Sequence, residues 1–306
     1  MNNFSYLGFV FRPACAENQE TISAFLRKHP QQLCGYTHAT LEAWKAFVVS
    51  CRETSAPETM LIAYRPIPEA PPILLQPIGE LPTDFQNHIF REAETLDNPL
   101  QIFGVSGYFL ERHPEFVSRF YARDERNYAN YIYRVENLAD LRGRKYSRKR
   151  NLISQARNQY SWETHSLTEN MVDECFAVLK SIQREENPSM EGMSARELNA
   201  LETTLRNFRR LRQQGILISI DGRPAAFSIF EAINATTAAI HFERALRSYK
   251  GLYQVINQET ARVIRTLGLE FINREEDVGD VGLRTAKLSY YPLELITAWE
   301  LTYKKV

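Results

Sequence analysis

The residues best suited to chemistry lie near the C-terminal end of the chain. Asn273 follows a short apolar run that predicts a buried strand, and Glu275 and Asp277 come after it at alternate positions. Arg284 and Lys287 follow a pair of glycines that lets the chain turn back. Carboxylates and cations are costly to gather in a packed interior unless a substrate uses them. The segment therefore predicts one site for a polar, charged substrate, in which Asn273 orients a carbonyl group.

The same residue types suit acyl transfer, in which an acceptor loses a proton and an oxyanion needs a positive partner. Glu275 or Asp277 would accept the proton or hold an ammonium group, and Tyr290 would act as an acid toward the leaving group. Arg284 and Lys287, three residues apart on one face of a short helix, would hold a carboxylate, phosphate or oxyanion. The structural alternative is an ion pair between Arg284 and Glu275, with Tyr290 filling the core.

The elements that must position these residues repeat along the chain. In the second half, two helical stretches precede three strands, a long helix and a last strand, the order of an acyl-CoA N-acyltransferase (GNAT) domain. Their expected ranges are Asn170–Arg184, Ala195–Gln213, Ile216–Ile220, Ala225–Ile233, Thr237–Glu243, Lys250–Leu267 and Leu269–Ile272. The first half repeats the strand–strand–helix–strand part at Met60–Arg65, Ile73–Ile78, Asp84–Leu96 and Leu100–Val105. The sequence predicts an α/β (α+β) fold of two tandem GNAT-like domains: a degenerate one at 1–140 and a second, with the active cleft, at 141–306.

The turn before the long helix is a second candidate site, formed by Tyr249, Lys250 and Gly251. In a GNAT domain, backbone N–H groups at this helix N-terminus hold the pyrophosphate of acyl-CoA. This chain has one glycine where that loop usually has a pair, so the turn suits a phosphate or carboxylate but matches acetyl-CoA binding weakly. The alternative is an ordinary helix start with Ser248 as its cap.

Charge is balanced overall and concentrated locally. Lys+Arg and Asp+Glu number 37 each, so no global field favours nucleic acid or membrane. Residues 141–157, however, hold seven basic side chains and no acidic one. This segment predicts a surface that binds a polyanion such as tRNA or a nucleotide cofactor, or else a solvated helix paired with acidic neighbours. The predicted contacts are Arg144, Lys145, Arg148, Lys149 and Arg150.

Several classes of protein are not favoured by the composition. No apolar run approaches 18 residues, so no membrane span is expected, and the N-terminus lacks the features of a signal peptide. The cysteines Cys15, Cys34, Cys51 and Cys175 show no paired spacing, which argues against a zinc site or disulfides and for a cytoplasmic setting. The six histidines show no ligand spacing, so no metal is expected, and His241 reads as a core histidine beside the cleft.

Three runs then carry a resemblance that spans most of the chain: Arg144–Asn151, Tyr249–Asn257 and the specific motif Asn273–Tyr290. They resemble the soluble DUF2156 proteins grouped with the phosphatidylglycerol lysyltransferase C-terminal domain. The resemblance implies two GNAT-like domains in tandem, as in the peptidoglycan-bridge aminoacyltransferases. The membrane-bound branch of that family moves lysine or alanine from aminoacyl-tRNA to a lipid head group, whereas the final motif here is the version of the soluble group.

The function expected from the residues and the resemblance together is transfer of an acyl or aminoacyl group to an amine or hydroxyl acceptor, either a small molecule or a peptide. The donor stays open between aminoacyl-tRNA and acyl-CoA. Two alternatives remain: an acetyl-CoA-dependent N-acetyltransferase, and a catalytically inactive protein that binds a small molecule or peptide on the same fold.

Overall fold

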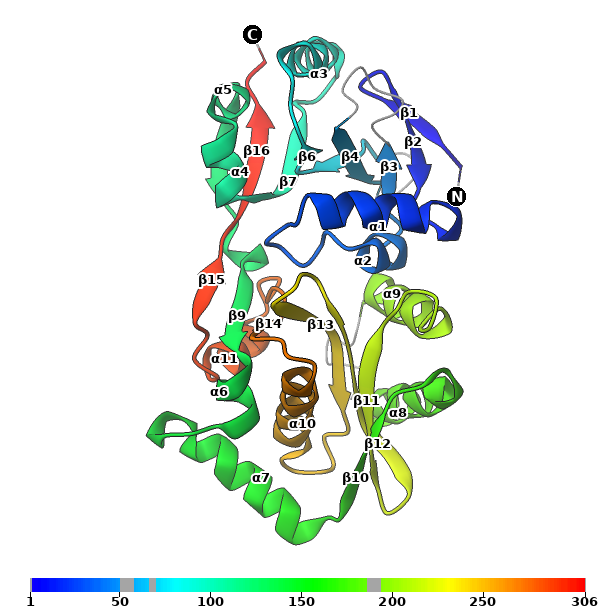
Figure 1. The fold of residues 1–306 in the computed structure, drawn as a ribbon, viewed down its shortest axis with the longest axis vertical. Helices are drawn as coiled ribbons and strands as arrows, with labels where there is room; N and C mark the ends of the chain where they lie inside the picture. The colour runs from blue at the N-terminus through cyan, green and yellow to red at the C-terminus, as the bar shows by residue number, and fades with distance from the viewer. Residues whose placement is uncertain (1, 50–57, 66–69, 186–193, 306) are drawn as a thin grey trace. The chain divides into compact units, whose positions relative to one another are not determined.

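Each of two units in the chain is built round its own mixed β-sheet (Figure 1). The computed structural model describes residues 2–49, 58–65, 70–185 and 194–305. One unit comprises Met1–Asn130, Glu276–Gly279 and Ile296–Val306, and the other comprises Tyr131–Glu275 and Asp280–Leu295. The mixed α/β fold expected from the sequence is therefore present.

The sheet of the first unit has the order β1-β2-β3-β4-β5-β7-β16-β8, with β6 paired to β4. Its strands are β1 Phe4–Tyr6, β2 Phe9–Pro13, β3 Phe47–Val49, β4 Thr59–Tyr64, β5 Ile73–Leu75, β6 Ile78–Gly79, β7 Gln101–Ser106, β8 Phe120–Asp124 and β16 Ala298–Tyr303. Its helices are α1 Gln19–Lys28, α2 His38–Ala43, α3 Thr83–Thr95, α4 Gly107–Arg112 and α5 Pro114–Ser118, with short 3-10 turns at Ala16–Asn18 and Arg126–Tyr128.

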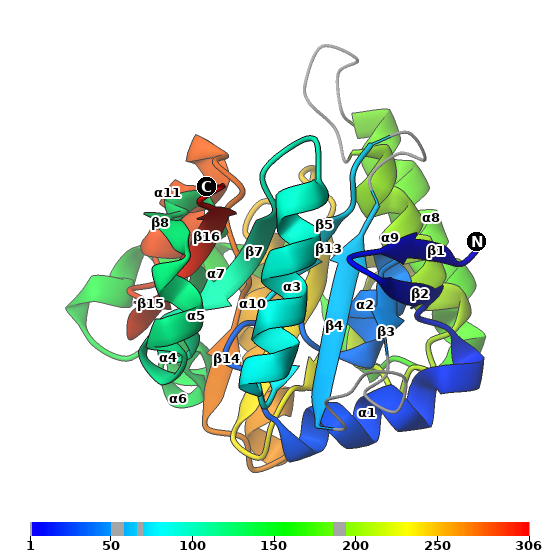
Figure 2. The same cartoon turned by 90° about the horizontal axis from the view of Figure 1, so that it is seen from above.

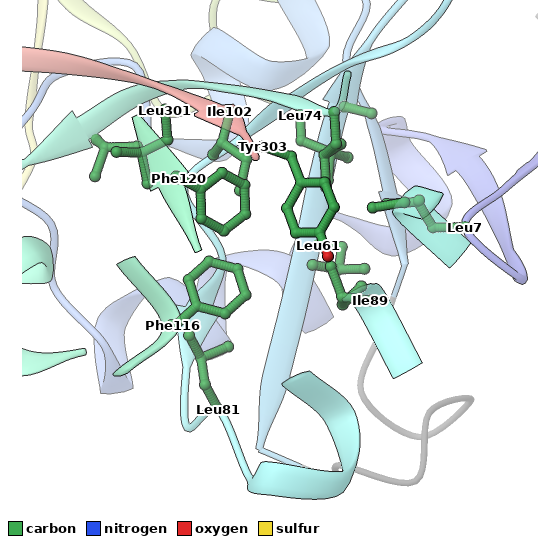
Figure 3. Close-up of a cluster of buried hydrophobic side chains, with 14 of the residues drawn as sticks. Leu7, Leu61, Leu74, Leu81, Ile89, Ile102, Phe116, Phe120, Leu301 and Tyr303 are labelled. Atoms are coloured by element: carbon green, nitrogen blue, oxygen red, sulfur yellow. The ribbon is translucent and has the colours of Figure 1, made fainter. Parts of the chain in front are cut away.

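The core of this unit forms between α3 and the sheet, and Figure 2 shows α3 lying along β4, β5 and β7. The helix buries Phe85, Ile89 and Ala93, which recur every four residues and so share one face. Aromatic rings complete the cluster: Phe116 and Phe120 pack beside Leu301 and Tyr303 of the last strand (Figure 3).

The sheet of the second unit has the order β10-β11-β12-β13-β14-β9-β15. Its strands are β9 Asn130–Arg134, β10 Trp162–Ser166, β11 Gln214–Ile220, β12 Arg223–Ala232, β13 Thr237–Ala245, β14 Phe271–Asn273 and β15 Glu294–Ile296. Its helices are α6 Val135–Asp140, α7 Ser147–Gln159, α8 Val172–Glu185, α9 Ala195–Arg206, α10 Leu252–Thr266 and α11 Val281–Leu288, with 3-10 turns at Arg144–Tyr146 and Glu169–Met171.

Helices cover both faces of this second sheet. Figure 1 shows α10 on one side of β12 and β13 and α8 and α9 on the other. Alternation along β13 matches this arrangement, because Glu243 contacts Asn257 of α10 whereas its neighbour Arg244 pairs with Glu197 of α9. Glu243 and Arg244 therefore lie on opposite faces of β13.

The two sheets share a connectivity. In the first unit β4 and β5 are antiparallel, and α3 then crosses over to β7, which pairs parallel to β5. In the second unit β12 and β13 are antiparallel, and α10 crosses over to β14, which pairs parallel to β13. The repeated strand–strand–helix–strand order expected from the sequence is thus visible in the pairing of both sheets, although residues 73–78 form two short strands instead of one.

Each sheet is completed by a strand from the other half of the chain. In the first unit β7 pairs antiparallel with β16, which follows the second unit in sequence. In the second unit β14 pairs antiparallel with β9, which follows the first unit in sequence. Contacts therefore group residues from Tyr131 onward with the second unit and return Ile296–Val306 to the first, whereas the sequence suggested a single boundary at 140/141.

Candidate functional site

The place where β13 and β14 separate organises the polar residues of the second unit. The two strands pair only from Thr237 with Phe271 to Ala239 with Asn273, but β13 continues to Ala245. Beyond the last pair, β13 carries His241 and Glu243, and the chain that leaves β14 brings in Arg274 and Glu275. We call this place the strand divergence.

His241 lies between two carboxylates at the strand divergence. Its Nδ1 is 2.7 Å from Glu275 Oε1, and its Nε2 is 2.9 Å from Glu231 Oε1. Burial lowers the pKa of His241, but hydrogen bonds with both carboxylates outweigh burial and raise the pKa to about 10. The ring is therefore an imidazolium at neutral pH, with both nitrogens donating, and it fixes the direction of the Glu275 carboxylate.

A second ion pair lies beside this group. The Arg274 guanidinium donates to Glu243 Oε1 at 2.9 Å, and Asn257 of α10 donates to the other oxygen of that carboxylate. Burial opposes the charge of Arg274, yet Glu243 raises its pKa. The guanidinium carbon lies 5.3 Å from the ring centroid of Tyr290, which burial keeps protonated by raising its pKa. The pair therefore adds a fixed charge distribution next to a phenol.

Glu275 is held by its backbone as well as by His241. Its φ is 57°, a left-handed conformation that non-glycine residues seldom adopt. Its N–H donates to Asn273 Oδ1 at 2.8 Å, and its carbonyl accepts from Tyr131 N. The Glu275 side chain is 26% exposed, more than His241 or Glu231 beside it. A strained residue that its surroundings fix in place is typical of functional sites.

The structure brings several of the sequence-predicted residues together here and assigns others different surroundings. Asn273 is fully buried and orients Glu275, and Tyr290 is buried beside Arg274. Lys287 is also buried: its Nζ donates to the Arg274 carbonyl at 2.6 Å and lies over the Tyr131 ring, so it faces the protein interior. Its neighbour on α11, Arg284, is half-buried.

Asp277 is grouped with the first unit and has a partner there. Its carboxylate is fully buried and accepts from Arg126 at 3.1 Å and from the Gly279 N–H at 3.0 Å. A buried carboxylate with these donors has the contacts of a structural ion pair. The role proposed for Asp277 from the sequence therefore gains no support from its contacts.

The basic segment has an outer and an inner part. Arg144, Lys145 and Arg148 are exposed. Lys149 turns inward instead: its Nζ donates to Ser289 Oγ at 2.6 Å and lies 4.1 Å from the Tyr290 ring centroid. Burial and the Arg274 charge lower the pKa of Lys149. Arg150 donates to two backbone carbonyls at the end of α6, which is a local structural role.

The start of α10 is covered by α7. Gly251 has φ 88° and is the N-cap of α10, and a Cβ there would lie 2.5 Å from the Leu152 carbonyl oxygen and 3.2 Å from Ala156. Tyr249 packs edge-on against Tyr160, at the end of α7, and Lys250 is exposed. The glycine thus allows close packing of two segments at the position where a GNAT domain binds a pyrophosphate.

The corresponding divergence in the first unit is held by neutral groups. Beyond the parallel pairing of β5 with β7, Gln76 accepts from Ser106 N–H and Oγ–H and donates to Gln31, and Tyr36 donates to the Gly104 carbonyl. These amide and hydroxyl groups satisfy one another. The two units therefore differ at this place. In the second unit the contacts join charged side chains, whereas in the first unit they join uncharged ones.

Sequence reasoning missed Glu231, Glu243 and Arg274. The two glutamates occur in strands with no unusual pattern. Only the folded sheet brings Glu231 to His241, 10 positions away, and Glu243 to Arg274, 31 positions away. A usable signal was an acidic residue within each of two largely apolar strands, because such strands seldom carry charge on a buried face. His241, expected as a core histidine, is buried but doubly ion-paired.

Among the described residues, no group of His, Cys, Asp or Glu side chains is arranged to hold a metal ion. Cys15, Cys34 and Cys175 form no disulfide, and Cys51 lies outside the described residues. In the same part of the chain, no helix is both long and apolar enough to cross a bilayer.

Solved structures share this fold, which is that of tandem GNAT proteins. A conserved protein of unknown function from Bacteroides thetaiotaomicron is 27% identical, with a TM-score of 0.85 over 96% of this chain and 99% of that one. The C-terminal domain of a putative lysylphosphatidylglycerol synthetase from Agrobacterium fabrum is 13% identical, with a TM-score of 0.65 over 94% and 92%. A tandem GNAT protein from the clavulanic acid biosynthesis pathway is 11% identical, with a TM-score of 0.50 over 95% and 98%.

The chain belongs to the family described as phosphatidylglycerol lysyltransferase, C-terminal, which it matches over residues 30–300. This agrees with the resemblance drawn from the three sequence runs. No curated protein matches the chain significantly.

Proposed function

We propose that the chain is an aminoacyltransferase that moves an aminoacyl group from aminoacyl-tRNA to an amine or hydroxyl acceptor at the strand divergence of the second unit. The observation that carries this proposal is a pair of charged groups at the end of β14, in a family of transferases: Glu275 with His241, and Arg274 with Lys149 beside Tyr290. Buried charges of both signs are expensive, and such groups cluster where a substrate uses them.

The roles follow from the contacts. One carboxylate oxygen of Glu275 accepts a hydrogen bond from His241. The second oxygen can therefore take the proton of the acceptor amine or hydroxyl as that group attacks the ester carbonyl carbon. Lys149 would stabilise the negative charge that develops on the carbonyl oxygen. When the bond to the ribose oxygen breaks, Tyr290, which stays protonated, would give that oxygen its proton. His241 acts on this chemistry only through the position of Glu275.

Two features favour tRNA over acyl-CoA as the donor. The exposed cations Arg144, Lys145 and Arg148 belong to the same segment as the inward-facing Lys149, so a bound polyanion would lie next to the proposed centre. At the start of α10, by contrast, the Leu152 carbonyl oxygen lies 2.5 Å from the place where a Cβ on Gly251 would be, so α7 packs closely against that glycine. A carbonyl oxygen also repels phosphate, so the acetyl-CoA alternative loses its principal binding feature.

The donor can be tested directly with hydroxylamine as a general acceptor. Purified protein is given either a mixed pool of labelled aminoacyl-tRNA or labelled acetyl-CoA, and hydroxamate formation above the spontaneous rate is measured. We expect acceleration with at least one aminoacyl-tRNA and none with acetyl-CoA. The opposite pattern would assign the chain to the acetyl-CoA-dependent enzymes, and no acceleration with either donor would favour the inactive binding protein.

The basic surface needs its own test. Replacement of three exposed cations by Gln should weaken tRNA binding and flatten its dependence on salt, by about 0.7 to 0.9 in the log–log slope for each phosphate that is no longer neutralised. Arg223→Gln, at the exposed first residue of β12, is the matched control. Equal salt slopes for the triple variant and the control would refute polyanion binding by this segment. The three replacements are Arg144→Gln, Lys145→Gln and Arg148→Gln.

A further inference from the structure

Tyr291 presents an aromatic ring to solvent beside the proposed centre. Its side chain is 47% exposed, whereas the preceding Tyr290 is buried. Lys145 Nζ lies 5.2 Å from the Tyr291 ring centroid, and Tyr146 packs edge-on against the same ring at a centroid distance of 5.6 Å. An exposed ring is therefore supported from one side by a buried aromatic and flanked by an exposed cation.

The backbone fixes this ring in place. Tyr291 has φ 53°, which is unusual for an aromatic residue, and its N–H donates to the Leu288 carbonyl. Tyr146 also donates its hydroxyl to the Tyr290 carbonyl at 3.1 Å, which ties the two neighbouring tyrosines to the basic segment. The strained backbone turns Tyr290 inward toward Arg274 and Tyr291 outward toward solvent.

The chemistry of this arrangement suits a nucleotide. Every base has a planar face that stacks on an aromatic side chain, and a neighbouring Lys can bind the adjoining phosphate. A ligand without negative charge would gain nothing from the Lys145 charge at that position. We propose that Tyr291 is a stacking platform for an unpaired base at the single-stranded end of the RNA donor, with Lys145 binding the phosphate next to that base.

This inference rests on the proposed function for its choice of RNA, and it adds a residue that positions the donor. A base stacked on Tyr291 would lie one residue along the chain from Tyr290, the group proposed to protonate the ribose oxygen. Tyr291 would thus set the register of the RNA end relative to the reacting ester, without contact with the reacting atoms.

The test is equilibrium binding of a fluorescein-labelled single-stranded pentaribonucleotide, followed by anisotropy, together with the same oligomer made abasic at its last two positions. Tyr291→Leu should weaken binding of the intact oligomer roughly fivefold to a hundredfold, the range for loss of one base stack. Tyr291→Phe, which keeps the ring, should bind as the wild type does. The abasic oligomer should bind wild type and Tyr291→Leu equally.

Tyr108→Leu is the matched control, because Tyr108 is also exposed, at 56%, and also has a guanidinium nearby, that of Arg112 at 6.0 Å. Equal affinity of wild type and Tyr291→Leu for the intact oligomer would overturn the inference, as would an equal loss in the Tyr108 variant. The proposed function fails separately: if no aminoacyl-tRNA supports transfer but oligomer binding still depends on the Tyr291 ring, the stacking site stands and only the transferase role is refuted.

Discussion

His241 should make the stability of the protein fall as the pH rises above neutrality. Its imidazolium donates to Glu231 and Glu275 at 2.9 and 2.7 Å, and its side chain is only 7% exposed, so solvent screens these contacts little. The pKa of His241 rises from 6.5, the ordinary value, to about 10 in the folded protein. The folded state therefore holds one more proton than the unfolded state between these two values.

The sign and size of the effect follow from linkage. Because the folded pKa is the higher one, the stabilisation is complete below about pH 6.5 and is lost as the pH rises through about 10. Because the folded state binds one extra proton, the free energy of unfolding falls by about 1.4 kcal/mol for each unit by which the pH rises. From pH 7 to pH 9 this amounts to roughly 2 to 3 kcal/mol.

The assay is urea unfolding at pH 7, 8 and 9, followed by circular dichroism, for wild type and His241→Gln. The neutral Gln should lower stability at pH 7 by about 3 kcal/mol or more, because it leaves two carboxylates without their shared cation. The difference between the two proteins should then shrink as the pH rises. His165→Gln, at a half-exposed histidine on β10, serves as the control and should leave the pH dependence unchanged. Parallel pH profiles for wild type and His241→Gln would refute the reasoning.

Three further predictions test other parts of the structure. Asp277→Asn should lower stability by roughly 1.5 to 3 kcal/mol, because it removes the charge that pairs with Arg126, and an unchanged melting temperature would show that the pair contributes nothing. Lys287→Ala should lower the melting temperature by several degrees, since it deprives the Arg274 carbonyl of a donor inside the protein. A melting temperature that is unchanged by calorimetry would instead favour the ligand-binding role expected from the sequence. Separate chains 1–140 and 141–306 should each fail to fold, because each lacks a strand of its own sheet, and a cooperative thermal transition in either chain alone would contradict this.

The long elements of the second unit could be predicted because their patterns are local. The helix expected at Lys250–Leu267 is α10, Leu252–Thr266, whose buried residues Val255, Ile256 and Ile264 recur at helical spacing. The strand expected at Thr237–Glu243 is β13, which begins at the same residue and ends at Ala245. Spacing of this kind depends on neighbours within one element, so no knowledge of the fold is needed.

The exchange of strands could not be predicted from the sequence. The pairing of β9 with β14 and of β16 with β7 joins segments that lie well over one hundred residues apart. Short apolar strands such as β9 carry no signal for their partner, because any edge of similar pattern satisfies their hydrogen bonds. A boundary drawn from the order of elements alone therefore differs from the units that the contacts define.

The candidate site was predictable to the extent that it lies in one segment. Asn273, Glu275 and Tyr290 stand out in the sequence, and the structure places all three in the second unit at or beside the strand divergence. Their partners come from β12, β13 and α7, and only the folded chain shows that His241 orients Glu275 or that Lys149 turns inward. Lys287 illustrates the reverse case, since its type suggests a ligand-binding cation and its burial shows an interior contact.

The central claim is that Glu275 carries out aminoacyl transfer at the strand divergence. The most direct measurement is the single-turnover rate of hydroxamate formation from a saturating aminoacyl-tRNA, for wild type, Glu275→Gln and the control Glu163→Gln, whose carboxylate on β10 is exposed. We predict that Glu275→Gln is slower by about 10²- to 10⁴-fold, the contribution of a general base, with tRNA affinity unchanged. A Glu275→Gln rate equal to that of wild type and of the control would contradict the account.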